Sequence, residues 1–133
     1  MVYALDTNIL IHLVRSSPAI CAKRNAVVEN GDSLIIPPFA NYEMRRGFLY
    51  RQAPAKEKAY QVFCDIFSVG EMNSEIWECA ARIYADLRRA GRTVEDADLL
   101  IAAFCIVGGH TLVTHNVRHF ENIGGLKIED WLE

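Results

Sequence analysis

Short apolar runs alternate with helical patterns along this chain. Three runs predict buried strands, because each is a compact apolar stretch bounded by turn or polar residues: residues 2–5 (VYAL), 33–37 (SLIIP) and 111–114 (TLVT). Two weaker runs predict further short strands at residues 68–72 (SVGEM) and 126–131 (LKIEDW). The predicted strands are therefore spread over the whole chain.

The segments between these runs carry apolar residues at helical spacing. The predicted helices cover residues 7–17, 18 to about 30, 37 to about 52, about 56 to 67, about 74 to 90, and 97–107. Strands that alternate with helices indicate right-handed β-α-β crossovers and a parallel sheet with helices on both faces. We therefore expect an α/β fold with three layers, α/β/α, around a central parallel sheet.

Size and composition favour one compact soluble domain. A chain of 133 residues, 51% of them hydrophobic, is long enough to bury its own core, so residues 1–133 are expected to form a single unit. The start of the chain has no basic leader, and the longest apolar run, residues 99–107, is far shorter than the roughly 20 residues that span a bilayer. We expect a cytoplasmic protein with no membrane association. The four cysteines lack C-x-x-C spacing and predict reduced thiols: Cys21, Cys64, Cys79 and Cys105.

The net charge of −3 argues against a broadly basic surface for nucleic acid. If several acids converge in one site, however, the remaining surface is close to neutral and leaves room for local basic patches. The candidate arginines are Arg45, Arg46, Arg92 and Arg118. The alternative for each is a solvated helix face.

Three acids directly precede the long apolar helix at residues 97–107. Thr93 has the residue type of a helix N-cap, and Asp96 three positions later fits a capping box. Negative charge in a first turn is favoured by the helix dipole, so Glu95 and Asp96 need no further role. Asp98 has apolar neighbours along the helix and predicts a buried carboxylate. Because an unpaired buried charge is costly, Asp98 either simply begins the helix or belongs to a site.

Four oxygen-bearing side chains are expected at one edge of the sheet. Asp6 and Asn116 follow predicted strands, at the carboxyl edge where such sheets bind ligands. Glu43 and Asp98 lie in helices that adjoin strands at the same edge. Clustered carboxylates repel one another unless a cation compensates, and hard oxygen donors suit Mg²⁺ or Mn²⁺. Structural alternatives stay open: Asp6 or Asn116 can cap a helix or a turn. Glu43 can form an i,i+3 ion pair with Arg46.

Three other classes of function also stay open. His115 and His119 are four positions apart and can share a helical face, but no third soft ligand supports a zinc site. An Asp at the end of a strand fits an aspartyl-nucleophile phosphatase, although that motif needs a second Asp two positions on, where this chain has Asn8. A non-enzymatic binding module would use its acids only for a structural metal or for a partner's basic group.

Four segments together resemble a known family. They are "LDTNIL" at the start, "NYEMRRG" in the middle, "DADLLIAA", and "TLVTHNVRHFENIGGLKIEDW" at the end. In this order they resemble a PIN domain, and specifically a VapC-type toxin ribonuclease of a type II toxin–antitoxin module. No single segment is specific, but the ordered set covers nearly the whole chain.

The resemblance implies a role for each matched acid. Asp6 and Asp98 would hold Mg²⁺ or Mn²⁺, directly or through water, and Glu43 would bind a second ion or orient and deprotonate the attacking water. Many PIN domains have a fourth acid where this chain has Asn116, and VapC proteins often have Asn there too. We expect auxiliary roles for Thr7, Asn8, Asp96 and Thr114. The four candidate arginines would contact the RNA.

The resemblance also implies partners and products. A VapB-type antitoxin would neutralise the protein by laying its C-terminal segment in an apolar groove, and the protein would form a homodimer. Candidate groove residues are Phe39, Tyr42, Phe48, Tyr50, Trp77 and Tyr84. Cleavage of RNA would leave 5′-phosphate and 3′-hydroxyl ends. If the acids converge, replacing Asp6 or Asp98 by Asn is expected to raise the melting temperature of the metal-free protein.

Overall fold

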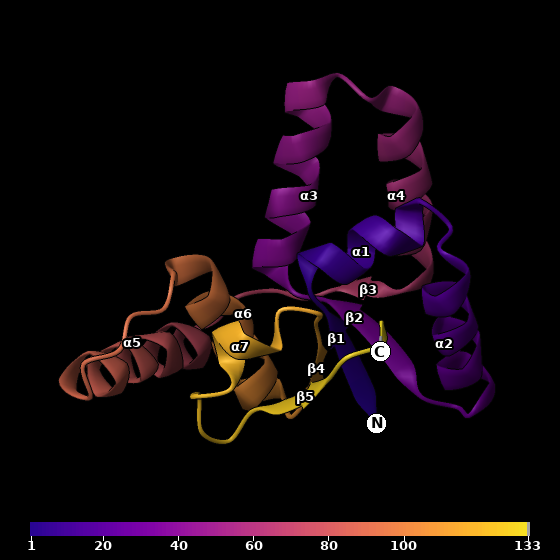
Figure 1. The fold of residues 1–133 in the computed structure, drawn as a ribbon. Coiled ribbons are helices and arrows are strands. Elements are labelled where there is room, and N and C mark those ends of the chain that lie inside the picture. The colour runs from indigo at the N-terminus through magenta and orange to yellow at the C-terminus, as the bar shows by residue number, and fades with distance from the viewer. Residues whose placement is uncertain (133) are drawn as a thin grey trace.

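A five-stranded parallel sheet forms the centre of the computed structural model, which describes residues 1–132 (Figure 1). The strand order is β3-β2-β1-β4-β5, and every neighbouring pair is parallel. The strands are β1 (Val2–Leu5), β2 (Ser33–Ile36), β3 (Ser68–Val69), β4 (Thr111–Val113) and β5 (Lys127–Glu129). All five lie within the runs predicted from the sequence, and the parallel sheet is confirmed.

Helices connect the strands. They are α1 (Thr7–Val14), α2 (Pro18–Glu29), α3 (Pro38–Arg51), α4 (Pro54–Ile66), α5 (Ser74–Arg89), α6 (Asp96–Gly108) and α7 (Val117–Phe120). Proline in the first turn starts α2, α3 and α4, where its missing N–H leaves no helical hydrogen bond unmade. Gly109 ends α6 in the left-handed conformation. The sequence predicted six of these helices, whereas α7 is too short to show a periodic pattern.

Both faces of the sheet are covered. In β4 three consecutive residues, Thr111, Leu112 and Val113, are buried, although successive side chains in a strand point to opposite faces. Figure 1 shows α5, α6 and α7 gathered on one side of the molecule, with α3 and α4 rising side by side elsewhere. The expected three-layer α/β/α arrangement is therefore confirmed.

A close contact between the end of β3 and α6 holds one part of this core together. The Gly70 N–H donates to the Ile36 carbonyl at 2.8 Å, and a Cβ on Gly70 would overlap the buried Phe104 ring. Gly70→Ala is expected to lower the free energy of unfolding by about 1–3 kcal/mol, because the ring or the backbone must move. Chemical denaturation measures this change.

The matched control is Gly124→Ala, where an added Cβ has no neighbour within 4 Å. Its effect is expected to stay within about 0.5 kcal/mol. Equal losses of stability in the two variants would contradict the proposed steric cause.

Two further features of the described residues concern helix hydropathy and the cysteines. Within residues 1–132, no helix combines the length and the apolar character needed to cross a bilayer. Cys21, Cys64, Cys79 and Cys105 are free thiols, and Cys105 is fully buried. The cysteines therefore form no disulfide frame.

Candidate active site at the carboxyl end of the sheet

The register of the central strands places the ends of β1 and β4 side by side. Leu5 pairs with Val113, and the Asp6 N–H donates to the Val113 carbonyl at 2.9 Å. The next residues along the two strands, Asp6 and Thr114, are consequently neighbours although they are far apart in the sequence. This edge is where parallel α/β sheets carry their ligands.

The Asp6 carboxylate accepts hydrogen bonds from three donors. Its Oδ1 accepts from the Thr7 N–H at 2.8 Å, which makes Asp6 the N-cap of α1. Its Oδ2 accepts from the Thr114 hydroxyl at 2.7 Å and from the Asn8 amide at 3.1 Å. The side chain is buried, with Asp6 5% exposed. The helix-cap alternative is thus correct, and the same contacts also fix the carboxylate at the sheet edge.

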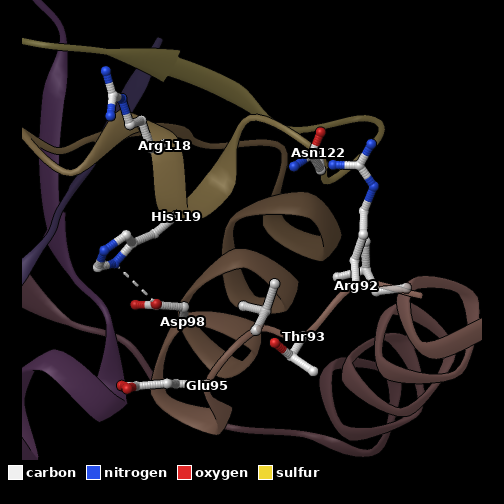
Figure 2. Close-up of a pocket in the computed structure, with 9 residues that line it drawn as sticks. Arg92, Thr93, Glu95, Asp98, Arg118, His119 and Asn122 are labelled. Carbon is white, nitrogen blue, oxygen red and sulfur yellow. Dashed lines mark ion pairs between the residues drawn. The ribbon is translucent and has the colours of Figure 1, made fainter. Parts of the chain in front are cut away.

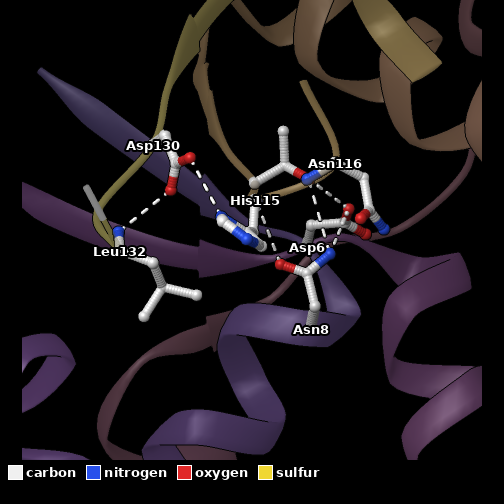
Figure 3. A network of polar contacts seen from close by, with 7 residues as sticks. Asp6, Asn8, His115, Asn116, Asp130 and Leu132 are labelled. Atoms are coloured by element: carbon white, nitrogen blue, oxygen red, sulfur yellow. Dashed lines mark hydrogen bonds and ion pairs between the residues drawn. The ribbon is translucent and has the colours of Figure 1, made fainter. Parts of the chain in front are cut away.

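A polar network links the segment after β4 to the start of α1 (Figure 3). The fully buried Thr114 hydroxyl accepts from the Asn116 N–H at 3.0 Å, and the Asn8 side-chain oxygen accepts from the His115 N–H at 3.0 Å. The Asn116 side chain is exposed beside this network, and Asn116 is the N-cap residue of α7 without a side-chain capping bond. Asn8 and Thr114 therefore position Asp6.

Glu43 reaches the same edge from α3. Its Oε1 accepts from the Thr7 hydroxyl at 2.7 Å, while its Oε2 lies 3.6 Å from the Arg46 guanidinium. The ion pair that the spacing suggested is therefore present. Thr7 contacts two acids through different atoms: its main chain binds Asp6 and its hydroxyl binds Glu43.

Asp98 is presented by the first turn of α6 and pairs with a histidine from α7. Its Oδ2 lies 3.2 Å from the His119 Nδ1, and 18% of its side chain is exposed. Burial raises the pKa of Asp98 to about 6, while His119 opposes this rise and the charges of Asp6, Glu95 and Glu43 add to it. The three matched acids are thus within electrostatic range of one another.

The three acids do not form a preassembled cation cage. Among residues 1–132, no group of three carboxylate, imidazole or thiol side chains is close enough to hold a metal ion. Each acid is instead held by other groups: Asp6 by hydrogen-bond donors, Glu43 by Thr7 and Asp98 by His119. The three acids offer hard carboxylate oxygens, the donor type that Mg²⁺ and Mn²⁺ prefer. Burial is the main cause of the raised pKa of Asp98, and the charges of Asp6 and Glu43 add to it, a contribution that a bound cation would relieve.

The four candidate arginines lie in two places. Arg92 and Arg118 line a pocket of about 450 Å³ that reaches Asp98 (Figure 2). Arg46 is exposed, stacks over Tyr42 and pairs with Glu43. Arg45 instead turns toward α4, where it donates to the Gln61 side-chain oxygen. Arg92 and Arg118 are therefore the two candidate arginines that line the same pocket as Asp98.

Two details of the acid-rich segment differ from the sequence prediction. The N-cap of α6 is Glu95 rather than Thr93, and no side-chain capping bond is made. The capping-box prediction is wrong because Val94 packs against the core and the chain is still extended at Glu95, so that the helix begins at Asp96. Thr93 lines the pocket instead, and Asp96 is exposed in the first turn.

The two histidines do not share a helical face. His115 precedes α7 and its Nδ1 lies 3.0 Å from Asp130, whereas His119 lies within α7 and pairs with Asp98. The helical pair of imidazoles on which the zinc alternative rested is therefore not present among residues 1–132. The contact between His119 and Asp98 was missed in the sequence, since it joins two separate helices and no local spacing encodes it.

Comparison with solved structures defines the class of this fold. The chain matches VapBC2 from Rickettsia felis, solved with a DNA fragment from its promoter, with a TM-score of 0.91 and 22% identity over 98% of this chain and 99% of that one. It matches VapBC-1 from nontypeable Haemophilus influenzae with a TM-score of 0.85 and 29% identity, covering 100% of both chains. The fold is thus that of the matched chains in these two structures.

Sequence comparison gives the family. The PIN domain model matches residues 3–126. Ribonuclease VapC1 of Haemophilus influenzae strain R2866 is 30% identical over 132 residues, 98% of each chain, and the tRNA(fMet)-specific endonuclease VapC of Shigella flexneri is 32% identical over 130 residues, 97% of each chain. The chain belongs to the PIN domain family and, by this full-length similarity, to its VapC ribonucleases.

Proposed function

We propose that this protein is the toxin of a type II toxin–antitoxin module and hydrolyses phosphodiester bonds of RNA with Mg²⁺ or Mn²⁺. The observation that carries the proposal is the meeting of Asp6, Glu43 and Asp98 at the carboxyl end of the sheet in a chain similar to VapC ribonucleases over its whole length. The relatives named ribonuclease and endonuclease support RNA as the substrate.

The proposal gives each acid a role. Asp6 and Asp98 would hold the ion, and Glu43 would orient and deprotonate the attacking water. The bound ion would lower the pKa of that water and stabilise charge that develops on the phosphate. Thr7, Thr114 and Asn8 keep the first acid in place through the hydrogen bonds described above. Asn116 supplies a neutral amide at the fourth position, exposed beside Thr114.

The proposed partner is a VapB-type antitoxin in the cytoplasm. The solved VapBC complexes of Rickettsia felis and Haemophilus influenzae support this class of partner. Four of the candidate aromatic residues are exposed and remain available for it: Tyr42, Tyr50, Trp77 and Tyr84. Phe48 is buried in the core and Phe39 is partly buried, so Phe48 is excluded as a docking residue. A homodimer remains part of the proposal.

The two rival functions make different demands on the site. An aspartyl-nucleophile phosphatase needs a second acid at position 8, and the Asn8 amide instead donates to Asp6 at 3.1 Å. A binding module would bind metal without cleaving RNA. The cleavage experiment below separates this last alternative from the proposal.

The proposed activity is tested with purified protein and structured RNA in Mg²⁺, in Mn²⁺ and in EDTA. Cleavage is expected with either metal and not in EDTA, because the acids act through the ion. The products are expected to carry 5′-phosphate and 3′-hydroxyl ends, which end-specific ligation detects. Cleavage that persists in EDTA would contradict the proposal, and so would metal binding without cleavage of any RNA.

A further inference from the structure

A pocket of about 450 Å³ is lined in part by Asp98, while neither Asp6 nor Glu43 is among its lining residues. It lies between the end of α5, the segment that leads into α6, and α7 with the residues after it (Figure 2). Its volume is within the roughly 300–1,000 Å³ of pockets that hold small organic ligands. The pocket is therefore large enough for one nucleotide.

The lining combines guanidinium, neutral polar and apolar groups with the carboxylates of Glu95 and Asp98 and the imidazole of His119. Guanidinium groups come from Arg92 and Arg118, and neutral hydrogen-bonding groups come from Thr93 and Asn122. Leu87 and Val94 contribute apolar surface. In Figure 2 the Arg92 guanidinium is drawn beside Asn122, on the opposite side of the pocket from Asp98 and His119. Arg92 and Asn122 thus lie away from the acid that is proposed to act on the phosphate, whereas Arg118 is drawn on the side of His119.

The two guanidinium groups are not engaged by acids of the chain. Within residues 1–132, neither Arg92 nor Arg118 forms an ion pair, whereas Arg46, Arg82 and Arg89 each pair with a neighbouring carboxylate. The first two arginines therefore keep their hydrogen-bond donors for a ligand. One guanidinium group can donate two parallel hydrogen bonds to two oxygens of a phosphate.

We propose that this pocket binds the nucleotide adjacent to the cleaved phosphodiester of a single-stranded RNA segment. Arg92 and Arg118 bind its phosphate oxygens. Asn122, whose amide carries both donors and an acceptor, binds the edge of the base, and Leu87 and Val94 contact the base or sugar face. The assignment rests on the proposed function, because it takes the cleaved phosphate to lie at Asp98.

This subsite accounts for RNA binding by an acidic protein. The net charge of −3 gives no general attraction for a polyanion, so affinity has to come from local groups. Arg92 supplies such a local attraction on the side of the pocket away from Glu95 and Asp98, and the neutral amide of Asn122 beside it supplies discrimination between bases.

The test measures binding, in EDTA, of three fluorescent single-stranded 12-mers made of A, C or U alone. Arg92→Ala is expected to weaken binding by about tenfold and to reduce the slope of log affinity against log salt by about 0.7, the value of one lost phosphate contact to single-stranded nucleic acid. Asn122→Ala is expected to leave that slope unchanged and to reduce the differences in affinity among the three probes. The control is Arg82→Ala, which removes the same charge from α5 outside this pocket.

Two results would overturn the subsite. One is an Arg92→Ala affinity within twofold of the wild type, and the other is an equal loss in Arg82→Ala, which would mean that the arginines act only through overall charge. Failure of the subsite and failure of the proposed function are distinguishable. If the wild-type protein cleaves RNA while Arg92→Ala binds RNA with unchanged affinity, the proposed subsite is wrong and the proposed function is not affected. If Arg92→Ala weakens RNA binding while the wild type cleaves no RNA with either metal, the proposed function is wrong and the pocket is supported only as an RNA-binding site.

Discussion

Asp98→Asn is expected to slow RNA cleavage at saturating Mg²⁺ by about 100-fold or more. Replacing a group that merely supports a metal ligand already costs about 10–100-fold in affinity or activity, so the loss of a ligand's charge should cost at least as much. Asn keeps the size of the side chain, removes its negative charge and replaces one carboxylate oxygen by an NH₂ group, so the packing of α6 is expected to be preserved. Single-turnover cleavage over a range of Mg²⁺ concentrations measures the effect.

Asp86→Asn is the matched control for this experiment. Asp86 is an exposed acid on α5 whose carboxylate pairs with Arg89, with 77% of each side chain exposed. The control makes the same change of charge and is expected to cleave RNA like the wild type. An Asp98→Asn protein that retains activity within tenfold of the wild type would remove Asp98 from the proposed site.

Asp6→Asn and Asp98→Asn are expected to change the stability of the metal-free protein in opposite directions. The sequence alone suggested that both would stabilise. The Asp6 carboxylate, however, accepts from the Thr7 N–H, the Thr114 hydroxyl and the Asn8 amide, and an Asn side chain would point an NH₂ group at one or more of these donors. Asp6→Asn is therefore expected to cost about 1–3 kcal/mol.

Asp98→Asn is expected to stabilise the metal-free protein at pH 8 by about 1 kcal/mol. The expected gain in stability is kept this small because the Asp98 side chain is partly exposed and because the substitution disrupts its contact with His119. The folded-state pKa of about 6 lies above the ordinary value of 3.8, so the folded protein binds a proton more tightly than the unfolded chain. The wild-type contribution of Asp98 thus becomes less favourable as the pH rises from about 4 to 6. Asp98→Asn should remove this part of the pH dependence.

Thermal and urea unfolding in EDTA at several pH values measure both variants. Asp86→Asn again serves as the control, because its carboxylate is exposed on the helix surface. A lower melting temperature for Asp98→Asn at pH 8, or a higher one for Asp6→Asn, would contradict the electrostatic and hydrogen-bonding environments described for the two acids.

The fold was predictable because its signals are local. The apolar runs of β1, β2 and β4 and the alternation of strands and helices lie in consecutive residues, and the parallel sheet follows from that order. The short helix α7 was missed because four residues complete only about one helical turn. Thr93 was misassigned as a cap because its residue type is right, whereas the packing of Val94 decided where α6 begins.

The candidate site was predictable only as a list of residues. Parallel strands bring Asp6 and Thr114 to one edge, so their proximity follows from topology. The contacts that hold the Glu43 and Asp98 carboxylates in place depend on how separate helices pack. The hydrogen bond from the Thr7 hydroxyl to Glu43 joins α1 to α3, and the ion pair between His119 and Asp98 joins α7 to α6. Neither contact has a spacing or a residue pattern that the sequence displays.

The hydrogen bond between Asp6 and Thr114 also bears on how the protein is made. These residues are 108 positions apart, and β1 lies between β2 and β4 in the sheet. A growing chain on the ribosome therefore carries Asp6 from the beginning but has neither Asp98 nor Thr114 until most of the domain has been synthesised. The candidate site can therefore assemble only after α6 and β4 have been synthesised and have packed beside β1, so a chain that lacks them would hold Asp6 without its buried hydrogen-bond partner Thr114.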